Sequence, residues 1–467
     1  MRSLALAFTL IFPLLSVPAP LQAQEETKPQ QLSDSGIQQG RTLIDGGNFI
    51  EALSVLRPLV PDRLDDTRQI NILFLVGRAA LGAAEHPQTP EAERKDYVDE
   101  AIGAFHRILV AQPELVRVRL ELARAFYVKG HDRLSRREFE RVLAEESLPP
   151  PVVANVRGFL SAIRQRRRWN GYFGMALAPD TNIGGSSDAE KVDIPDLFGV
   201  TPGPTVQADY HPDISSGLGF RVWGGGEYEH PLSAKVRLRG GASISRTEYE
   251  GQDFDRMLLS AHGGTRWLAN GRTDMSLLAS ARRSWSGGEP QYKALGARFE
   301  LSRFLSRRVL VRTQASYHQH VYDEDVYLDG PRSDISLTGL WQATPTMRLE
   351  ANVGLTREHM ESELWRNSGR LMGLGMSLDL PRGFTVGLNG SYRWTDYDDR
   401  GSTLPWIASE DSRMDRTRTL SISLYNRGFT VRGFSPKLVL TRETRESNAQ
   451  LQDYKRDRAE LQFVRLL

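Results

Sequence analysis

The sequence predicts a two-domain protein in which a helical-repeat domain precedes an all-β transmembrane barrel of about 14 antiparallel strands. Three observations predict this fold class. Apolar residues recur at helical spacing up to residue 165, they alternate with polar residues after residue 168, and the alternating segments continue to the C-terminus. We therefore expect a secretory signal peptide at 1–23, a helical domain at 31–165 and a barrel at 169–467.

The N-terminal segment predicts export from the cytoplasm. Arg2 gives a positive start, residues 4–17 are mostly apolar, and Ala23 offers a small residue before the polar Gln24. The apolar stretch is too short to cross a bilayer as a helix. The alternative is that this stretch is a buried helix of the mature fold.

Composition excludes several classes of partner and site. The 467 residues carry a formal net charge of +2 and contain no cysteine. A balanced charge does not steer a protein to phosphates, so we expect no nucleic-acid partner. Without cysteine, disulfide frameworks, thiolate zinc sites and thiol nucleophiles are excluded, and no motif indicates a cofactor.

An internal repeat indicates that the helical domain is a solenoid of tetratricopeptide (TPR) type. Two buried-looking positions recur at a shift of 34 residues, about one TPR period. An earlier copy fits if about 15 residues are inserted, which we place at 83–97. The repeating residues are Ala52, Ala101 and Ser135 at one position, and Leu56, Phe105 and Phe139 at the other. Such solenoids bind extended peptides or partner domains; the alternative is a structural plug or spacer.

Strict alternation of apolar and polar residues predicts strands with two different faces. It is clearest at 235–244 and 347–356. The alternating runs are mostly about 10 to 14 residues long, whereas strands of soluble sandwiches are usually shorter. In a membrane barrel the charged side chains must point into a wet lumen, because each would cost a few kcal/mol on the lipid face. The charged residues expected to face the lumen are Arg237, Arg239, Arg312, Arg348 and Glu350.

The connections between these strands alternate between short and long. Asn270-Gly271 is the strongest of the short hairpin signals, and long loops are expected at 179–216, 321–331, 360–369 and 396–412. The expected strand starts are Trp169, Gly217, Ala234, Asp255, Arg272, Tyr292, Arg308, Arg332, Met347, Arg370, Thr385, Arg413, Phe434 and Tyr454. An even count with short turns on one side is typical of outer-membrane barrels, and places the short turns and the helical domain in the periplasm. Aromatic residues expected in the interface girdles are Trp169, Tyr172, Trp285, Tyr392, Trp394 and Phe463.

The segment 169–183 joins the two domains and carries a motif. Its defining residues are Trp169, Gly171, Pro179, Asp180, Thr181, Asn182 and Ile183. Together with the order of the domains, this motif resembles the opening of the barrel in the surface lipoprotein assembly modifier (Slam) family. The resemblance implies transfer of lipoproteins or soluble secreted proteins across the outer membrane. It also implies that outer-membrane lipid surrounds the barrel, and it is compatible with the barrel-assembly machinery as a further partner.

The residues of the motif also have a physical interpretation of their own. Asp180 and Asn182 are expected to form an Asx-type turn that folds the long first loop over or into the lumen. This turn is either a structural loop anchor or a cargo contact or gate. The chain departs from the usual barrel ending in one respect, since it closes on the apolar Leu467 instead of an aromatic residue.

The sequence gives little support for an enzyme. His318 and His320 share one strand face, with Asp323 to Asp325 beyond them, which indicates either a divalent-cation site or a solvated loop tip. No serine is paired with a histidine by any motif, so we nominate no catalytic, cofactor-binding or metal residue. The leading hypothesis is a protein-exporting barrel whose helical domain captures cargo in the periplasm. The alternatives are an exopolysaccharide-exporting barrel and a passive porin.

Overall fold

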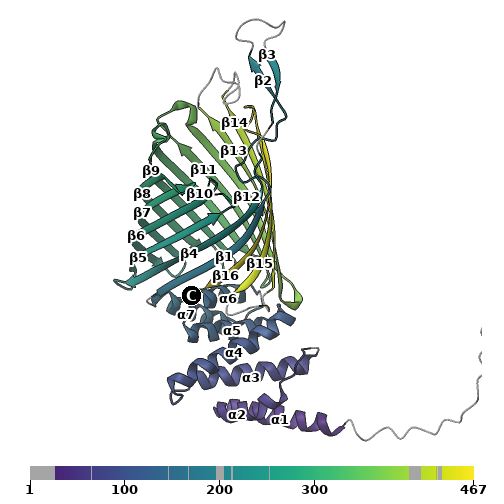
Figure 1. Cartoon of the computed structure of the whole chain (residues 1–467). Helices are drawn as coiled ribbons and strands as arrows, with labels where there is room; N and C mark the ends of the chain where they lie inside the picture. Colours follow the sequence, from purple (N-terminus) through teal and green to yellow (C-terminus); the bar gives the residue numbers. More distant parts are fainter. Residues whose placement is uncertain are drawn as a thin grey trace, which may run out of the picture.

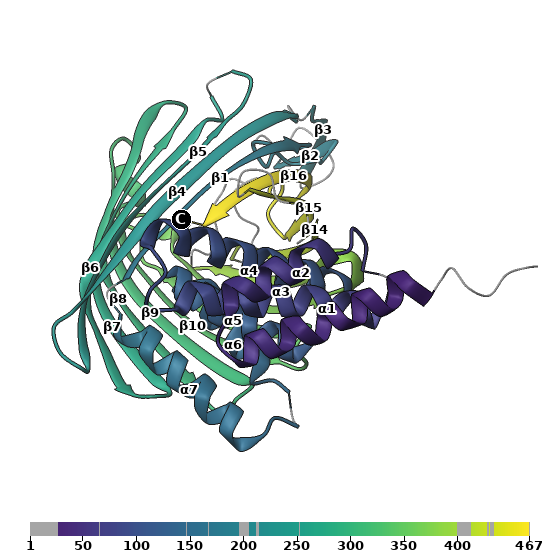
Figure 2. The same cartoon turned by 90° about the horizontal axis from the view of Figure 1, so that it is seen from below.

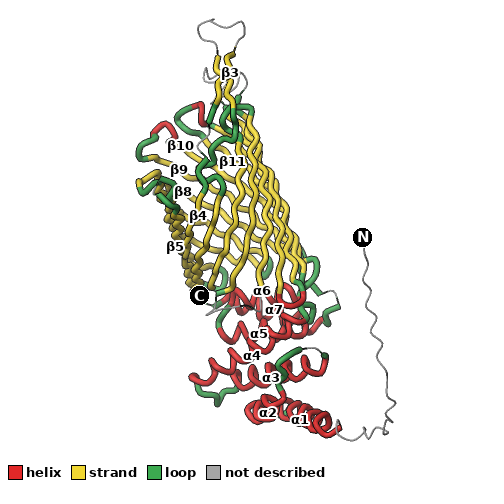
Figure 3. Tube along the Cα trace, turned by 45° about the vertical axis from the view of Figure 1, so that its right-hand side comes forward, coloured by secondary structure: helices red, strands yellow, loops and turns green. Residues whose placement is uncertain are grey.

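The computed structural model places a stack of helices at one end of a long barrel (Figures 1 and 3). It describes residues 27–64, 66–145, 147–166, 168–195, 205–211, 214–251, 253–398, 412–426, 429 and 434–466. The expected signal peptide at 1–23 lies outside the described residues. We call the end of the barrel beside the helices the helical end and the opposite end the far end.

The helices form antiparallel pairs that stack on one another. Their bounds are α1 Thr27–Asp45, α2 Phe49–Leu56, η1 Arg57–Leu59, α3 Thr67–Glu85, α4 Glu91–Ala111, α5 Val116–Lys129, α6 Asp132–Val142 and α7 Pro150–Gln165. The repeat detected in the sequence falls on α2, α4 and α6. All six repeating residues are fully buried at these equivalent positions: Ala52, Ala101, Ser135, Leu56, Phe105 and Phe139.

The expected insertion at 83–97 is not a separate loop. Glu85 ends α3 and Glu91 begins α4, so only a short turn separates them. These two helices are 19 and 21 residues long, whereas α5 and α6 have 14 and 11. The extra residues therefore largely lengthen α3 and α4. The repeating positions still fall on the equivalent helices α2, α4 and α6.

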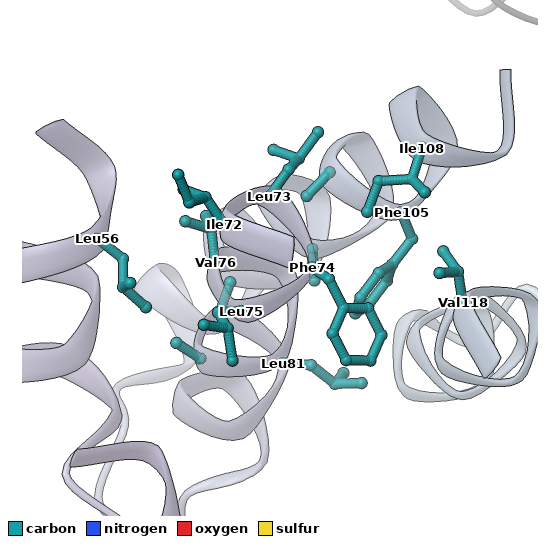
Figure 4. Packing of buried hydrophobic residues seen from close by; sticks show 14 of the residues in the cluster. Leu56, Ile72, Leu73, Phe74, Leu75, Val76, Leu81, Phe105, Ile108 and Val118 are labelled. Atoms are coloured by element: carbon teal, nitrogen blue, oxygen red, sulfur yellow. The ribbon is translucent and has the colours of Figure 1, made fainter. Parts of the chain in front are cut away.

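An apolar core holds the helix pairs together (Figure 4). The rings of Phe74 and Phe105 lie 5.9 Å apart between α3 and α4, and Val118 of α5 belongs to the same cluster. A second cluster around Phe139 joins α5, α6 and α7. Full burial of one such side chain contributes roughly 1.5–3 kcal/mol. Of the helices that the structure describes, none has both the length and the apolar character needed to cross a membrane.

Fourteen antiparallel strands close into the barrel. The strands are β1 Arg168–Asp180, β4 Gly217–Pro231, β5 Val236–Glu248, β6 Arg256–Asn270, β7 Thr273–Ser286, β8 Glu289–Phe304, β9 Val309–Tyr322, β10 Gly330–Gln342, β11 Met347–Glu358, β12 Asn367–Asp379, β13 Phe384–Tyr397, β14 Met414–Asn426, β15 Ser435–Ser447 and β16 Tyr454–Leu466. Each strand pairs with its neighbour in sequence, and β1 pairs with both β4 and β16. Every expected strand start falls within three residues of the observed one, which confirms the predicted fold class.

The long loop predicted at 179–216 contains two short strands. Strands β2, Lys191–Pro195, and β3, Thr205–Asp209, form a hairpin of their own beyond the far end of the barrel (Figures 1 and 3). Short helical turns lie in other connections: η2 Val326–Leu328, η3 Glu363–Trp365 and η4 Pro381–Gly383. Between described residues, the β6–β7 connection at the helical end is tight, with only two residues between Asn270 and Thr273.

The barrel wall is apolar outside and polar inside. Leu238, Val353 and Leu374 are exposed on the outer face, whereas Arg239 lies on the inner face. A closed antiparallel barrel with this alternation and an even strand number is the architecture of outer-membrane proteins. One aromatic prediction was wrong, because Tyr172 lines the interior and does not belong to an outer girdle. Phe463 pairs with Met175, on the opposite face of β1 from Tyr172.

Candidate functional site

A charged chamber lies where helix α6 meets the helical end of the barrel. Seen from that end, the helices lie across part of the opening (Figure 2). The chamber has a volume of about 580 Å³ and is lined on the helical side by Asp132, Arg133 and Arg136 of α6. On the barrel side its charged lining comes from Glu227, Glu229, Arg239, His262, Arg266, Asp274, Glu300 and Arg312. The amphipathic α6 therefore packs apolar side chains into the helical core and presents charged ones to the lumen.

The wall of the chamber pairs most of its charges internally. Arg239 donates to Glu227 at 2.8 Å and to Glu300 at 2.5 Å. Arg266 donates to Glu229 at 2.6 Å and to Asp274 at 2.7 Å. Such charge-assisted hydrogen bonds hold long side chains in fixed positions and leave a polar, water-compatible surface.

The five charged residues predicted to face the lumen are placed as follows. Arg239 and Arg312 line the chamber, while Arg237 is buried beside it and donates to the Arg166 carbonyl at 2.8 Å. Arg348 donates to the Gln342 side chain at 3.0 Å. Glu350 lines a separate, smaller cavity of about 130 Å³. The structure thus gathers three of the five in or beside the chamber, and Arg348, at the start of β11, also lies near the helical end.

A chain of buried ion pairs connects the helices to the barrel. We call Arg119, Glu138, Arg141 and Asp379 the junction network. Arg119 of α5 donates to Glu138 of α6 at 2.7 Å, with side chains only 2% and 4% exposed. Arg141, one turn further along α6, donates to Asp379 at the end of β12 at 2.7 Å. Asp379 also accepts a hydrogen bond from Thr385 of β13 at 2.8 Å, so the network ends on the barrel wall.

The electrostatics of the junction network favour the charged form of Glu138. Burial alone would raise the pKa of the Glu138 carboxyl, but the guanidinium groups of Arg141, Arg137 and Arg119 hold that pKa well below its usual range. Burial lowers the pKa of Arg119, and Glu138 opposes that shift. Removing one partner would leave the other charged and buried, which is strongly destabilising. The network is therefore a buried polar connection between the two domains.

The junction motif holds the two ends of the barrel sheet together at the far end. We call Asp180, Thr181, Asn182, Arg456 and Asp457 the seam latch. Arg456 of β16 donates from two nitrogens to the buried Asp180 carboxylate of β1 at 2.9 and 2.5 Å. The Thr181 amide donates to the Asp457 carbonyl at 3.1 Å, and the Asp457 amide donates to the Thr181 hydroxyl at 2.9 Å.

The expected Asx-type turn is present within this latch. The Asn182 amide donates to the Asp180 side chain at 3.0 Å. The Asn182 side chain accepts from the Ser186 amide at 2.9 Å and donates to the Lys455 carbonyl of β16 at 3.3 Å. The turn thus folds the start of the first loop back against β16, so the motif serves both the loop and the closure of the barrel.

The remaining motif residues support the same strand. Trp169 is exposed on the outer wall, where its ring lies over Gly226 of β4. Gly171 pairs with the same Gly226. Ile183 is buried and its amide donates to the Ser215 carbonyl at 2.8 Å, which ties the beginning of the first loop to its end.

Sequence reasoning missed the residues that complete both clusters. Glu138, Asp379 and Arg456 were not singled out, because their partners are remote. Arg141 and Asp379 are 238 positions apart, and Asp180 and Arg456 are 276 apart. The only usable signal was the helical spacing that buries Glu138 beside Phe139 on the core face of α6.

The histidine pair has structural partners. His318 lies 2.7 Å from the Ser280 hydroxyl, and Asp323 accepts two hydrogen bonds from Arg283 at 2.7 and 3.0 Å. Within the described part of the chain, no three His, Asp or Glu side chains are grouped to hold a metal ion.

Comparisons with known proteins agree with the junction motif. A family model described as "Surface lipoprotein assembly modifier" matches residues 169–466. Surface lipoprotein assembly modifier 1 of Neisseria meningitidis serogroup B is 22% identical over 453 residues, covering 95% of this chain and 87% of that protein. The surface lipoprotein assembly modifier of Pasteurella multocida is 20% identical over 439 residues, covering 88% and 82%. The hemophilin secretion modulator of Acinetobacter baumannii is 23% identical over 321 residues, covering 64% and 62%.

Proposed function

Because the chain belongs to the surface lipoprotein assembly modifier family, we propose that it delivers a protein cargo, either a lipoprotein or a soluble protein, to the cell surface. Its relatives are named for surface lipoprotein assembly and for hemophilin secretion. In this proposal the barrel spans the outer membrane, the helical domain stands in the periplasm, and the helical domain captures the cargo.

The observation that carries the proposal is the position of α6 across the helical end of the barrel. Arg133 and Arg136 of α6 line the same chamber as Glu227 and Glu229 of the wall. A cargo segment bound on the helices would therefore stand directly at the entrance to a polar lumen. The junction network supports coupling, since a shift of α5 or α6 must break or move the Arg141–Asp379 contact.

A passive porin is less well supported by this arrangement. A diffusion pore has no use for a helical stack held across its entrance by buried ion pairs. We expect a small single-channel conductance for the intact chain in planar bilayers, and a larger one when 31–165 is deleted. An equally large, steady pore in both forms would favour the porin.

The decisive test is deletion of 31–165 behind the native signal segment. We expect the truncated barrel to fractionate with the outer membrane but to display none of its cargo on the cell surface. The cargo to follow is the protein encoded by the neighbouring reading frame, detected by surface labelling with and without this chain.

A matched control keeps every helix and breaks only the contact with the barrel. Asp379→Asn removes the charge partner of Arg141 and should reduce display without removing the helical domain. Normal display by the truncated chain would contradict a role for the helices in capture.

A further inference from the structure

The paired stretch between β1 and β16 is shorter than that between any other two neighbouring strands of the barrel, counted over the described residues. Its register comprises seven residue pairs, against 11 to 14 pairs at the other thirteen junctions. Leu466, the last described residue of β16, pairs with Tyr172. Among the described residues, positions 168–171 of β1 therefore pair only with β4. We call this junction the seam.

The seam is also interrupted near its far end. Pairing is continuous from Tyr172 to Leu177 and then resumes at Asp180. Pro179 lies in the gap and has no amide hydrogen to donate to a ladder. What holds the far end closed is therefore the seam latch, through Asp180–Arg456 and Thr181–Asp457.

An apolar groove opens on the outer wall beside this latch. It has a volume of about 630 Å³ and is lined by Leu420, Ile422, Leu440 and Ala459 of β14, β15 and β16, and by Pro179 of β1. Arg442 and Asp457 also line it, with their side chains 3.9 Å apart. Both lie on the outer face of the wall, one step further from the helical end than Leu440 and Ala459. The groove thus combines an apolar floor with a charged end.

The chemistry of the groove suits an acyl chain. Its apolar part lies on the membrane-facing wall, where hydrocarbon is the surrounding solvent. Its charged end suits the polar head of an acylated molecule. The groove is continuous with the seam, because Pro179 of β1 and Ala459 of β16 line it from the two sides.

We propose that the barrel wall opens between β1 and β16 and that the groove receives the acyl chains of a lipidated cargo as they leave the lumen. This inference rests on the proposed function. The polar chain of the cargo would follow the charged interior, while its lipid anchor would pass sideways into the bilayer. Such an exit spares the anchor a passage through water, where each exposed methylene is unfavourable.

The groove is tested with the purified full chain in phospholipid vesicles. The probe is a tripalmitoylated cysteinyl peptide with a photoreactive acyl chain, and a phosphatidylethanolamine with the same photoreactive chain serves for comparison. We expect the lipopeptide to label the groove at least tenfold more than the opposite wall. Ala459→Trp, which fills the groove, should abolish this excess, whereas Ala297→Trp on the outer face of β8 should not.

Equal labelling by the two probes would reduce the groove to ordinary lipid contact and overturn the assignment. The same conclusion would follow if Ala459→Trp and Ala297→Trp behaved alike.

The opening of the seam is tested by locking it with a disulfide, since the chain has no cysteine of its own. Leu177 and Leu461 are directly paired across the seam, and such Cα atoms lie about 4.5 to 5.5 Å apart, within the reach of a disulfide. We expect oxidised Leu177→Cys/Leu461→Cys to display a lipidated cargo at least tenfold less than the reduced form. The control Leu177→Cys/Phe220→Cys locks β1 to β4 instead and should display normally in both states.

The outcomes separate the two proposals. Undiminished display by the locked seam overturns this inference and leaves the proposed function standing. Failure of the unmodified chain to display any cargo removes the proposed function, and the labelling experiment then decides the groove on its own.

Discussion

The helical domain and the barrel bury opposite kinds of side chain. In the helical domain Phe105 and Ile108 lie in an apolar core, while Arg57 and Glu100 form an ion pair at the surface. In the barrel the order is reversed, with leucines such as Leu374 exposed and arginines such as Arg239 inside. The same residue type thus stabilises one domain and would destabilise the other, depending on whether the outside is water or hydrocarbon.

Helix α6 contributes both to the apolar core of the helical domain and to the charged interior of the barrel. Phe139 lies in the helical core, whereas Arg136, on the same helix, faces the charged chamber. The connection between two oppositely organised domains is therefore made by one amphipathic helix whose buried Glu138 and Arg141 form ion pairs. The following substitutions test this comparison, from the largest expected effect to the smallest.

Glu138→Gln tests the buried charge at the place where the two domains meet. It leaves Arg119 and Arg141 buried with less compensating charge, so we expect the free energy of unfolding of the helices to fall by about 3–5 kcal/mol. Thermal unfolding of the full chain in detergent, followed by helical circular dichroism, measures this loss. The exposed Glu91→Gln on α4 is the matched control and should change little.

The pH dependence of the same measurement has a defined sign. Arginines lower the pKa of Glu138 in the folded chain, so its contribution is complete above the unfolded value of 4.5 and is lost as the pH falls toward the folded value. Glu138→Gln should remove that part of the acid sensitivity. An unchanged acid profile would contradict the role assigned to this carboxylate.

Val353→Arg tests whether the outer face of the barrel wall accepts only apolar side chains. Val353 lies on the outer face near the middle of β11, where an arginine costs about 2–4 kcal/mol in the membrane. Asn352→Arg, one residue earlier, points into the lumen beside Glu350 and should cost much less. Folding of both variants into lipid vesicles, titrated with denaturant, gives the difference; equal costs would mean that the two faces are not as different as described.

Asn182→Ala should weaken the seam latch without altering the helical core or the packing of the barrel wall. It removes the hydrogen bonds to the Ser186 amide and to the Lys455 carbonyl, a loss of about 1–3 kcal/mol. Asn182→Asp keeps an acceptor for Ser186 and should lose less. The unfolding temperature of the barrel, read from strand circular dichroism, ranks the two variants, and the reverse ranking would refute the assigned hydrogen bonds.

Arg57→Ala should have the smallest effect. Its partner Glu100 is partly exposed and the pair faces water, so we expect a loss below about 1 kcal/mol. A loss as large as that of Glu138→Gln would show that surface and buried pairs of the helical domain contribute alike.

The sequence determines most of the barrel and the helical repeat for a simple reason. Alternation with period two over a full strand, ended by turn residues such as Asn270-Gly271, leaves only small uncertainty in where a strand begins. The repeat was similarly clear, because Phe105 and Phe139 occupy one buried position in successive helix pairs. Both signals are local, and local signals can be read from one chain.

The features that escaped prediction depend on contacts between remote residues. Nothing local distinguishes Asp379 or Arg456 from other charged residues near turns, and only closure of the barrel brings Arg456 to Asp180. The hairpin β2–β3 was missed because each strand has five residues. Tyr172 was misassigned because its aromatic character was weighed above its position in the alternation, which places it with Asn170 on the inner face.

The closure between Tyr172 and Leu466 has a consequence for biogenesis. Every other pair of neighbouring strands is contiguous along the chain apart from the hairpin in the first loop, so those ladders join segments that are close in sequence and need little loop closure. The edge of β1 must instead wait for β16, and an unpaired edge invites association with other chains.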